Sequence, residues 1–127
     1  MTRLRVGPIW LILAMASLSV PAGAAEADAT RGEKQFEECV ACHKMEPGAN
    51  GVGPSLHRIF ERRAGELADF RYSPALKRSG IAWTAETVDT FIADPQKTVP
   101  ANRMPYAGMP DASDRADLIA YLLKTSR

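Results

Sequence analysis

Residues 38–44 read ECVACHK. It holds the only two cysteines of the 127-residue chain, Cys39 and Cys42, with His43 directly behind them. In the C-x-x-C-H pattern, the two thiols add to the vinyl groups of a haem and the adjacent imidazole ligates the iron. The stretch therefore predicts one covalently attached haem c, held by Cys39 and Cys42 and ligated by His43.

Two other uses of the cysteine pair fit the sequence less well. A redox dithiol of the C-x-x-C type lies beside a βαβ pattern, and no strand-like alternating run borders this one. A zinc site would need further cysteine or histidine ligands, and only His57 is left. A covalent haem uses every residue of the motif and leaves no thiol for a disulfide.

The first 25 residues have the pattern of a secretory signal peptide. A basic start at Arg3 and Arg5 precedes an apolar run over residues 9–20, and small residues follow. We expect residues 1–25 to be removed, with cleavage after Ala24 or Ala25, and the rest to reach the periplasm. An uncleaved membrane anchor is the alternative, but residues 7–25 only approach the length of about 20 apolar residues that a span needs. We expect no stable membrane insertion after cleavage.

Residues 26–127 form one small domain, long enough to bury a modest core. The signal peptide carries two of the 16 basic residues and none of the 15 acidic ones, so the mature chain is close to neutral. Nothing in that balance indicates nucleic-acid binding. We expect a monomer.

The coarse pattern predicts an all-α domain with long loops. The expected helices cover residues 30–39, 73–79, 84–93 and about 111–124, and no convincing strand run occurs. Their starts are marked by Thr30, Ser73, Thr84 and either Asp111 or Ser113, which are residue types that cap helices. This architecture suits a chain that wraps around a prosthetic group.

A second axial ligand could come from His57, Met45, Met104 or Met109. Met45 follows His43 too closely to reach the opposite face of a haem, and His57 is expected on the same side as His43. Residues 99–110 form a proline-rich loop that is free to cross the other face. Either methionine in that loop could serve on chemistry alone, although a core position suits Met109 better.

Over nearly the whole mature length, the chain resembles the class I cytochromes c of mitochondria and bacteria. The matching segments are GEKQF, ECVACH, VGPSLHRIFERRAG, FRYSPALKRSGIAWTAET, VPANRMPYAG and RADLIAYL, in the family's order. The resemblance implies the cytochrome c fold for residues 26–127. It also implies that Met104, which stands in the family's T-K-M position, is the distal ligand.

Further roles follow from the resemblance alone. It implies that the carbonyl of Pro54 accepts a hydrogen bond from the ligand imidazole, and that Arg62, Tyr72 and Trp83 contact the buried haem propionates. A buried carboxylate needs such donors or a counter-charge. The resemblance also implies a crossing of the first and last helices at four residues: Gly32, Phe36, Leu118 and Tyr121.

The basic ring that many relatives carry at the haem edge is thin in this chain. Glu38 and Gln96 stand where lysine is common, while Lys97 and Arg103 remain. We expect apolar contacts to carry more of the docking, around three residues: Tyr106, Ala107 and Met109.

These features predict a soluble one-electron carrier with His/Met ligation, and not an enzyme. Its partners would be redox proteins such as a membrane cytochrome bc complex, a terminal oxidase or a periplasmic dehydrogenase. The alternative is a haem enzyme or ligand sensor, peroxidase-like, with an open distal site. That alternative needs acid–base residues beside the iron, and His57 is badly placed for this role.

Overall fold

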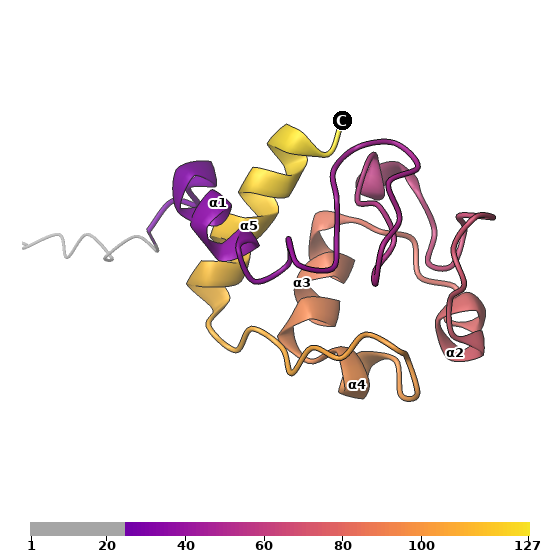
Figure 1. Cartoon of the computed structure of the whole chain (residues 1–127). Coiled ribbons are helices and arrows are strands. Elements are labelled where there is room, and N and C mark those ends of the chain that lie inside the picture. Colours follow the sequence, from indigo (N-terminus) through magenta and orange to yellow (C-terminus); the bar gives the residue numbers. More distant parts are fainter. Residues whose placement is uncertain (1–24) are drawn as a thin grey trace, which may run out of the picture.

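The computed structural model describes residues 25–127, so the predicted signal peptide lies outside the described residues except for Ala25. This part of the chain has five α-helices and one 3₁₀ helix (Figure 1): α1 (Ala29–Phe36), η1 (Ile59–Glu61), α2 (Pro74–Arg78), α3 (Ala85–Ala93), α4 (Pro95–Thr98) and α5 (Ala112–Thr125). Its only β-pairing is an isolated bridge between Arg63 and Ala82. The prediction of an all-α domain with long loops is confirmed.

Three helices begin at residues that the sequence marks as caps. Ser73 accepts a hydrogen bond from the backbone N–H of Leu76 and begins α2, with Pro74 at the first helical position. Thr84 forms a capping box with Thr87 at the start of α3. The carboxylate of Asp111 caps α5. Each cap satisfies backbone donors that a helix start would otherwise leave without a partner.

The first helix differs from its prediction at both ends. Its cap is Asp28 and not Thr30, because the Asp28 carboxylate accepts the backbone N–H of Thr30 at 2.7 Å. The helix ends at Phe36 and not at Cys39, because the backbone N–H of Cys39 bonds to the Phe36 carbonyl in a tighter turn. The cysteine motif therefore lies in a series of turns that follows the helix.

The first and last helices cross side by side (Figure 1). The rings of Phe36 and Tyr121 lie 5.4 Å apart at this crossing. A Cβ on Gly32 would come within 1.9 Å of the carbonyl oxygen of Asp117, so only glycine lets the two backbones approach this closely. The predicted crossing, including the role of glycine in it, is confirmed.

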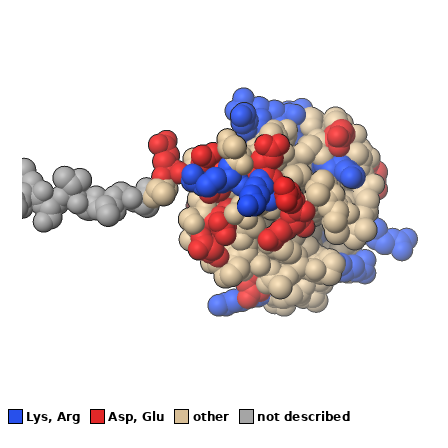
Figure 2. Space-filling view, turned by 60° about the vertical axis from the view of Figure 1, so that its left-hand side comes forward, with Lys and Arg blue, Asp and Glu red and all other residues tan. Residues whose placement is uncertain are grey.

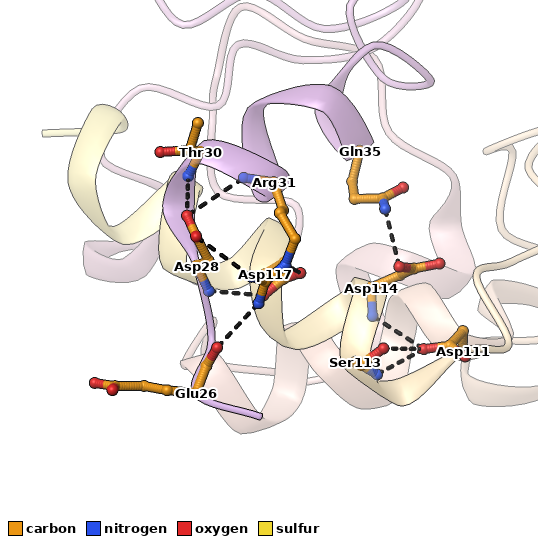
Figure 3. Close-up of polar contacts among 9 residues, drawn as sticks. All are labelled: Glu26, Asp28, Thr30, Arg31, Gln35, Asp111, Ser113, Asp114 and Asp117. Atoms are coloured by element: carbon orange, nitrogen blue, oxygen red, sulfur yellow. Dashed lines mark hydrogen bonds and ion pairs between the residues drawn. The ribbon is translucent and has the colours of Figure 1, made fainter. Parts of the chain in front are cut away.

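A polar cluster ties the two helices together at one side of the crossing (Figure 3). Arg31 binds the Asp117 carboxylate through two nitrogens, at 2.6 and 2.9 Å. The backbone N–H of Asp28 donates to the same carboxylate at 2.7 Å. Asp117 is only 4% exposed, and its charge is matched by the guanidinium group. Arg31 also donates to the Glu26 carbonyl, so Glu26 is already in contact with the domain.

The charges on this side of the molecule are mixed. The face over α1 shows acidic and basic side chains next to one another rather than a patch of one sign (Figure 2). Within residues 25–127, no helix combines the length and the apolar character that crossing a membrane requires.

Candidate haem site

A cavity of about 330 Å³ lies between the helices and the long loops. Much of its wall is apolar and comes from the buried faces of α3 and α5 and from the loops before them. It is lined by all eight residues predicted for the site: Cys39, Cys42, His43, Pro54, Arg62, Tyr72, Trp83 and Met104. The chain thus brings together around one cavity residues that are up to 65 positions apart in the sequence.

The turns after α1 place both cysteines and the histidine at the cavity. The backbone N–H groups of Cys42 and His43 both donate to the Cys39 carbonyl, at 3.1 and 2.9 Å. The two thiols are free and form no disulfide. Burial, with smaller effects of Glu38 and Cys42, raises the pKa of the Cys39 thiol to about 11. A thiol that stays protonated at neutral pH does not fit a redox dithiol.

The imidazole of His43 is held by the loop that follows it. Its Nδ1 lies 2.7 Å from the carbonyl oxygen of Pro54. A carbonyl only accepts, so Nδ1 carries a proton, and in the neutral form of the ring Nε2 keeps its lone pair. Burial lowers the pKa of His43, against an opposing effect of the bond to Pro54. The ring is therefore neutral, with one nitrogen available as a metal ligand.

Met104 and Met109 have different surroundings. Met104 is half-buried and lines the cavity, in the loop between α4 and α5. Met109 is buried in the hydrophobic core, does not line the cavity, and donates its backbone N–H to Ile92. Met45 and His57 also lie outside the cavity wall. Of the four candidates for a second axial ligand, only Met104 reaches the cavity that His43 lines.

Three further predicted residues bring polar groups to the cavity. One nitrogen of Arg62 donates to the Ser55 carbonyl at 2.6 Å. The Nε of Arg62 is buried without an acceptor, the only such side-chain atom among residues 25–127. Tyr72 and Trp83 are buried beside it, and burial raises the pKa of Tyr72 against an opposing effect of Arg62. A buried N–H without an acceptor is costly, which fits a site built for a bound carboxylate.

The rim of the cavity carries charges of both signs. The hydroxyl of Tyr106 donates to the carboxylate of Glu38 at 2.8 Å and links the methionine loop to the residue before Cys39. Arg71 and Arg103 are exposed and also border the cavity. Val52 is 71% exposed and adds an apolar patch. The rim is therefore neither strongly basic nor strongly acidic.

Among the residues of the cavity wall that were not predicted as site residues, two support the proposed ligands. Gly53 packs against the His43 ring, where a Cβ would lie 2.5 Å from Cε1. A glycine before a proline is typical of a turn, although a buried glycine can also mark a close approach to a neighbouring group. Asn102, two positions before Met104, is buried and bonded to its own loop. No sequence signal distinguishes it from an ordinary loop asparagine.

The fold and the cavity define a haem protein of the C-x-x-C-H type, and comparisons with known proteins agree. The family model for cytochrome c matches residues 29–126. Cytochrome c2 of Rhodoblastus acidophilus is 47% identical over 96 residues, which cover 75% of this chain and 90% of that protein. Cytochrome c2 of Blastochloris viridis is 45% identical over 102 residues, or 80% of each chain. The structure of cytochrome cH from Methylobacterium extorquens superposes with a TM-score of 0.73 at 43% identity, over 77% of this chain and 99% of that one.

The chain belongs to the cytochrome c family. It is an electron-transport protein with one covalently bound c-type haem. The cavity fits this cofactor on three counts: a neutral imidazole with a free nitrogen, a buried arginine N–H without an acceptor, and a glycine that leaves room for the ring of His43.

Proposed function

We propose that the chain is an exported one-electron carrier whose haem is held by thioethers to Cys39 and Cys42 and ligated by His43 and Met104. One observation carries the proposal: His43 and Met104, 61 positions apart, line the same cavity, while Met45, His57 and Met109 do not. With both axial positions taken by the protein, no vacant position remains for a substrate or gaseous ligand. This favours a carrier over a peroxidase-like enzyme or a sensor.

The chain's own residues would prepare the site for electron transfer. When bound, the haem supplies an Fe(III)/Fe(II) couple, and axial His/Met ligation raises its reduction potential. Pro54 fixes the tautomer and orientation of His43 by accepting from Nδ1. The apolar wall excludes water around the group. Pre-organised ligands of this kind keep rearrangement small when one electron enters or leaves.

Arg62, Tyr72 and Trp83 would hold the propionates. The buried Nε of Arg62 supplies a charged donor that has no acceptor in the protein. Tyr72 and Trp83 bring a hydroxyl and an indole N–H to the same cavity. Charge-assisted hydrogen bonds to a carboxylate are stronger than neutral ones, so Arg62 contributes most to this contact.

We further propose that residues 1–25 are a signal peptide, cleaved near Ala24 or Ala25, and that residues 26–127 act in the periplasm as a monomer. The contact from Arg31 to the Glu26 carbonyl supports this start of the domain. Suitable partners are a membrane cytochrome bc complex, a terminal oxidase or a periplasmic dehydrogenase. The mixed charges of the rim favour brief docking with any of them, since a carrier must leave each partner quickly.

The attachment is tested on the purified, exported protein. Acid–acetone extraction should leave the haem with the polypeptide, and the intact mass should equal residues 25–127 or 26–127 plus one haem. Spectra of both oxidation states should show a low-spin c-type haem with the weak near-infrared charge-transfer band of methionine ligation. Haem that extracts freely, or a mass that shows a disulfide between Cys39 and Cys42, contradicts the attachment. A high-spin spectrum contradicts the carrier function and favours the open-site alternative.

A further inference from the structure

Asn102 is a buried polar side chain in the loop that carries Met104. It is 8% exposed and forms part of the cavity wall, two positions before the methionine. Burying an amide is costly unless its donors and acceptors are matched. The partners of this side chain therefore show what it does.

Within residues 25–127, the Asn102 side chain bonds to backbone groups of its own region. Its Nδ2 donates to the carbonyls of Pro95 and Val99, at 2.8 and 2.9 Å. Its Oδ1 accepts the backbone N–H of Met104 at 2.8 Å. Both amide hydrogens are thus used within the protein, and the oxygen is directed at Met104. The side chain connects the backbone of Met104 to the start and end of α4.

The anchors at α4 are buried. Pro95 is among the most deeply buried side chains of the described residues, and Val99 is 5% exposed. Gln96 adds a bond from its side chain to the Asn102 carbonyl at 3.2 Å. The loop is therefore attached to a buried part of the core just before it reaches Met104.

The turn between these anchors and Met104 is strained. Ala101 has φ +65°, the left-handed region that a non-glycine residue adopts at a cost. Such a conformation persists only where the surroundings enforce it. The three bonds of Asn102 span Ala101 on both sides, from Val99 to Met104. These bonds hold the loop on both sides of the strained residue.

We propose that Asn102 is the positioning residue that keeps Met104 at the iron. The proposal rests on the proposed function, in which Met104 is the distal ligand. A thioether is a neutral ligand that an external base can replace. The stability of the proposed bond between Met104 and the iron therefore depends on how well the loop keeps the side chain in place. The carbonyl of Met104 accepts from the N–H of Tyr106 at 2.9 Å, and Asn102 supplies the matching restraint on the N–H side.

The experiment measures how readily imidazole replaces Met104 in the ferric, haem-loaded protein. Asn102→Ala removes the three side-chain bonds that hold the loop, so imidazole should bind at least about tenfold more tightly. The charge-transfer band should weaken and the reduction potential should fall. Asn102→Ser keeps an oxygen that can accept from residue 104, as Ser does in local turns, and should restore much of the band. Gln96→Ala removes only the bond to the Asn102 carbonyl and leaves the asparagine side chain intact, so it should raise the affinity for imidazole by less than Asn102→Ala does.

Each outcome separates the positioning role from the ligand assignment. If Met104→Ala leaves the band and the imidazole affinity unchanged, the proposed ligand is wrong. If Met104→Ala opens the iron while Asn102→Ala and Asn102→Ser behave as wild type, Met104 is the ligand and the role of Asn102 is refuted. Should Asn102→Ala not fold, Asn102→Ser and the amide exchange of Met104 in the wild type decide. Fast exchange of that N–H in the ferric protein would overturn the proposal, because the Asn102 bond would then not hold.

Discussion

The Nδ1 of His43 donates to the carbonyl oxygen of Pro54 over 2.7 Å, across a loop of ten intervening residues. The glycine before the proline leaves room for this contact, since a Cβ on Gly53 would lie 2.5 Å from the His43 Cε1. The position of the ring is therefore set from two sides, by an acceptor and by the lack of a side chain.

Replacing Gly53 by alanine should displace the His43 ring. The added methyl needs space that the ring occupies, and such overpacking costs about 1–3 kcal/mol. We expect a lower free energy of unfolding, measured by denaturant titration of the holoprotein, and a ferric spectrum with altered axial ligation.

Gly51→Ala is the matched control in the same loop. Gly51 is exposed, and its Cβ would meet only the Cys42 carbonyl, at an ordinary 3.6 Å. This variant should keep the wild-type spectrum and lose little stability. Equal losses of stability in the two variants would show that any added methyl group in this loop is destabilising, whether or not it meets His43.

Replacing the two methionines of the loop one at a time should have unequal effects. Met104→Ala should abolish the charge-transfer band and open the iron to cyanide or carbon monoxide, because it removes the proposed ligand from the cavity wall. Met109→Leu changes a core residue of similar volume, which usually costs less than about 1.5 kcal/mol, and should leave ligation intact. Absorption spectra with and without cyanide measure both. An opened iron in Met109→Leu would overturn the assignment.

The tie between α1 and α5 should weaken in acid. The hydrogen bond from Arg31, with the bond from Asp28, holds the pKa of Asp117 below its usual value near 3.8. A depressed carboxyl pKa contributes stability above the unfolded-state pKa, and this contribution is lost as the pH falls through the folded-state value. The free energy of unfolding should therefore decline as the pH drops below about 4.

Asp117→Asn isolates this contribution. The variant should be less stable than wild type at pH 7, and the difference should shrink as the pH falls below about 4. The control is Asp114→Asn, since Asp114 accepts one bond from the amide of Gln35 and its replacement keeps an acceptor there. Chemical denaturation at pH 7, 5 and 3 gives the comparison. A difference between wild type and Asp117→Asn that does not change with pH would contradict the linkage to Asp117.

Electron transfer to a partner should depend only weakly on salt. Glu38 at the rim is bonded to Tyr106, and few basic residues surround it, so little charge is available to screen over a Debye length of about 10 Å at 0.1 M. Stopped-flow transfer to a bc complex or oxidase, from low to high ionic strength, measures this. A steep fall in rate that Lys97→Glu or Arg103→Glu abolishes would show that a basic patch governs docking.

The apolar part of the docking face needs one correction. The sequence assigned Met109 to it along with Tyr106 and Ala107, but Met109 is only 5% exposed and packs in the core. It therefore offers no surface to a partner. Val52, which the sequence analysis did not assign to this face, is 71% exposed and borders the cavity.

Local signals predicted most of the helices and the centre of the site. C-x-x-C-H identifies the attachment chemistry because it uses adjacent residues, and Ser73, Thr84 and Asp111 act as caps through neighbours two or three positions away. Thr30 failed as a cap, because the backbone of Asp28 is fixed by Asp117, 89 positions later. When a tertiary contact decides which of two residues caps a helix, the local sequence does not show the choice.

The residues that support the proposed ligands were harder to predict from the sequence. Asn102 bonds to carbonyls whose positions depend on the path of the loop, and Gly53 matters only because the His43 ring returns to it. The unmatched Nε of Arg62 likewise depends on how the surrounding loops bury it. Contacts of this kind follow from three-dimensional packing, which a pattern of residue types does not encode.

The ion pair between Arg31 and Asp117 joins residues 86 positions apart in the sequence. This separation has a consequence for the order in which the domain folds. Closing a chain segment of that length costs about 4 kcal/mol of entropy. Under the proposed export, the N-terminal end emerges first and has no helical partner until the final residues have arrived. During that interval Cys39 and Cys42 are accessible on an open chain, which gives haem attachment its opportunity before the last helix closes the domain.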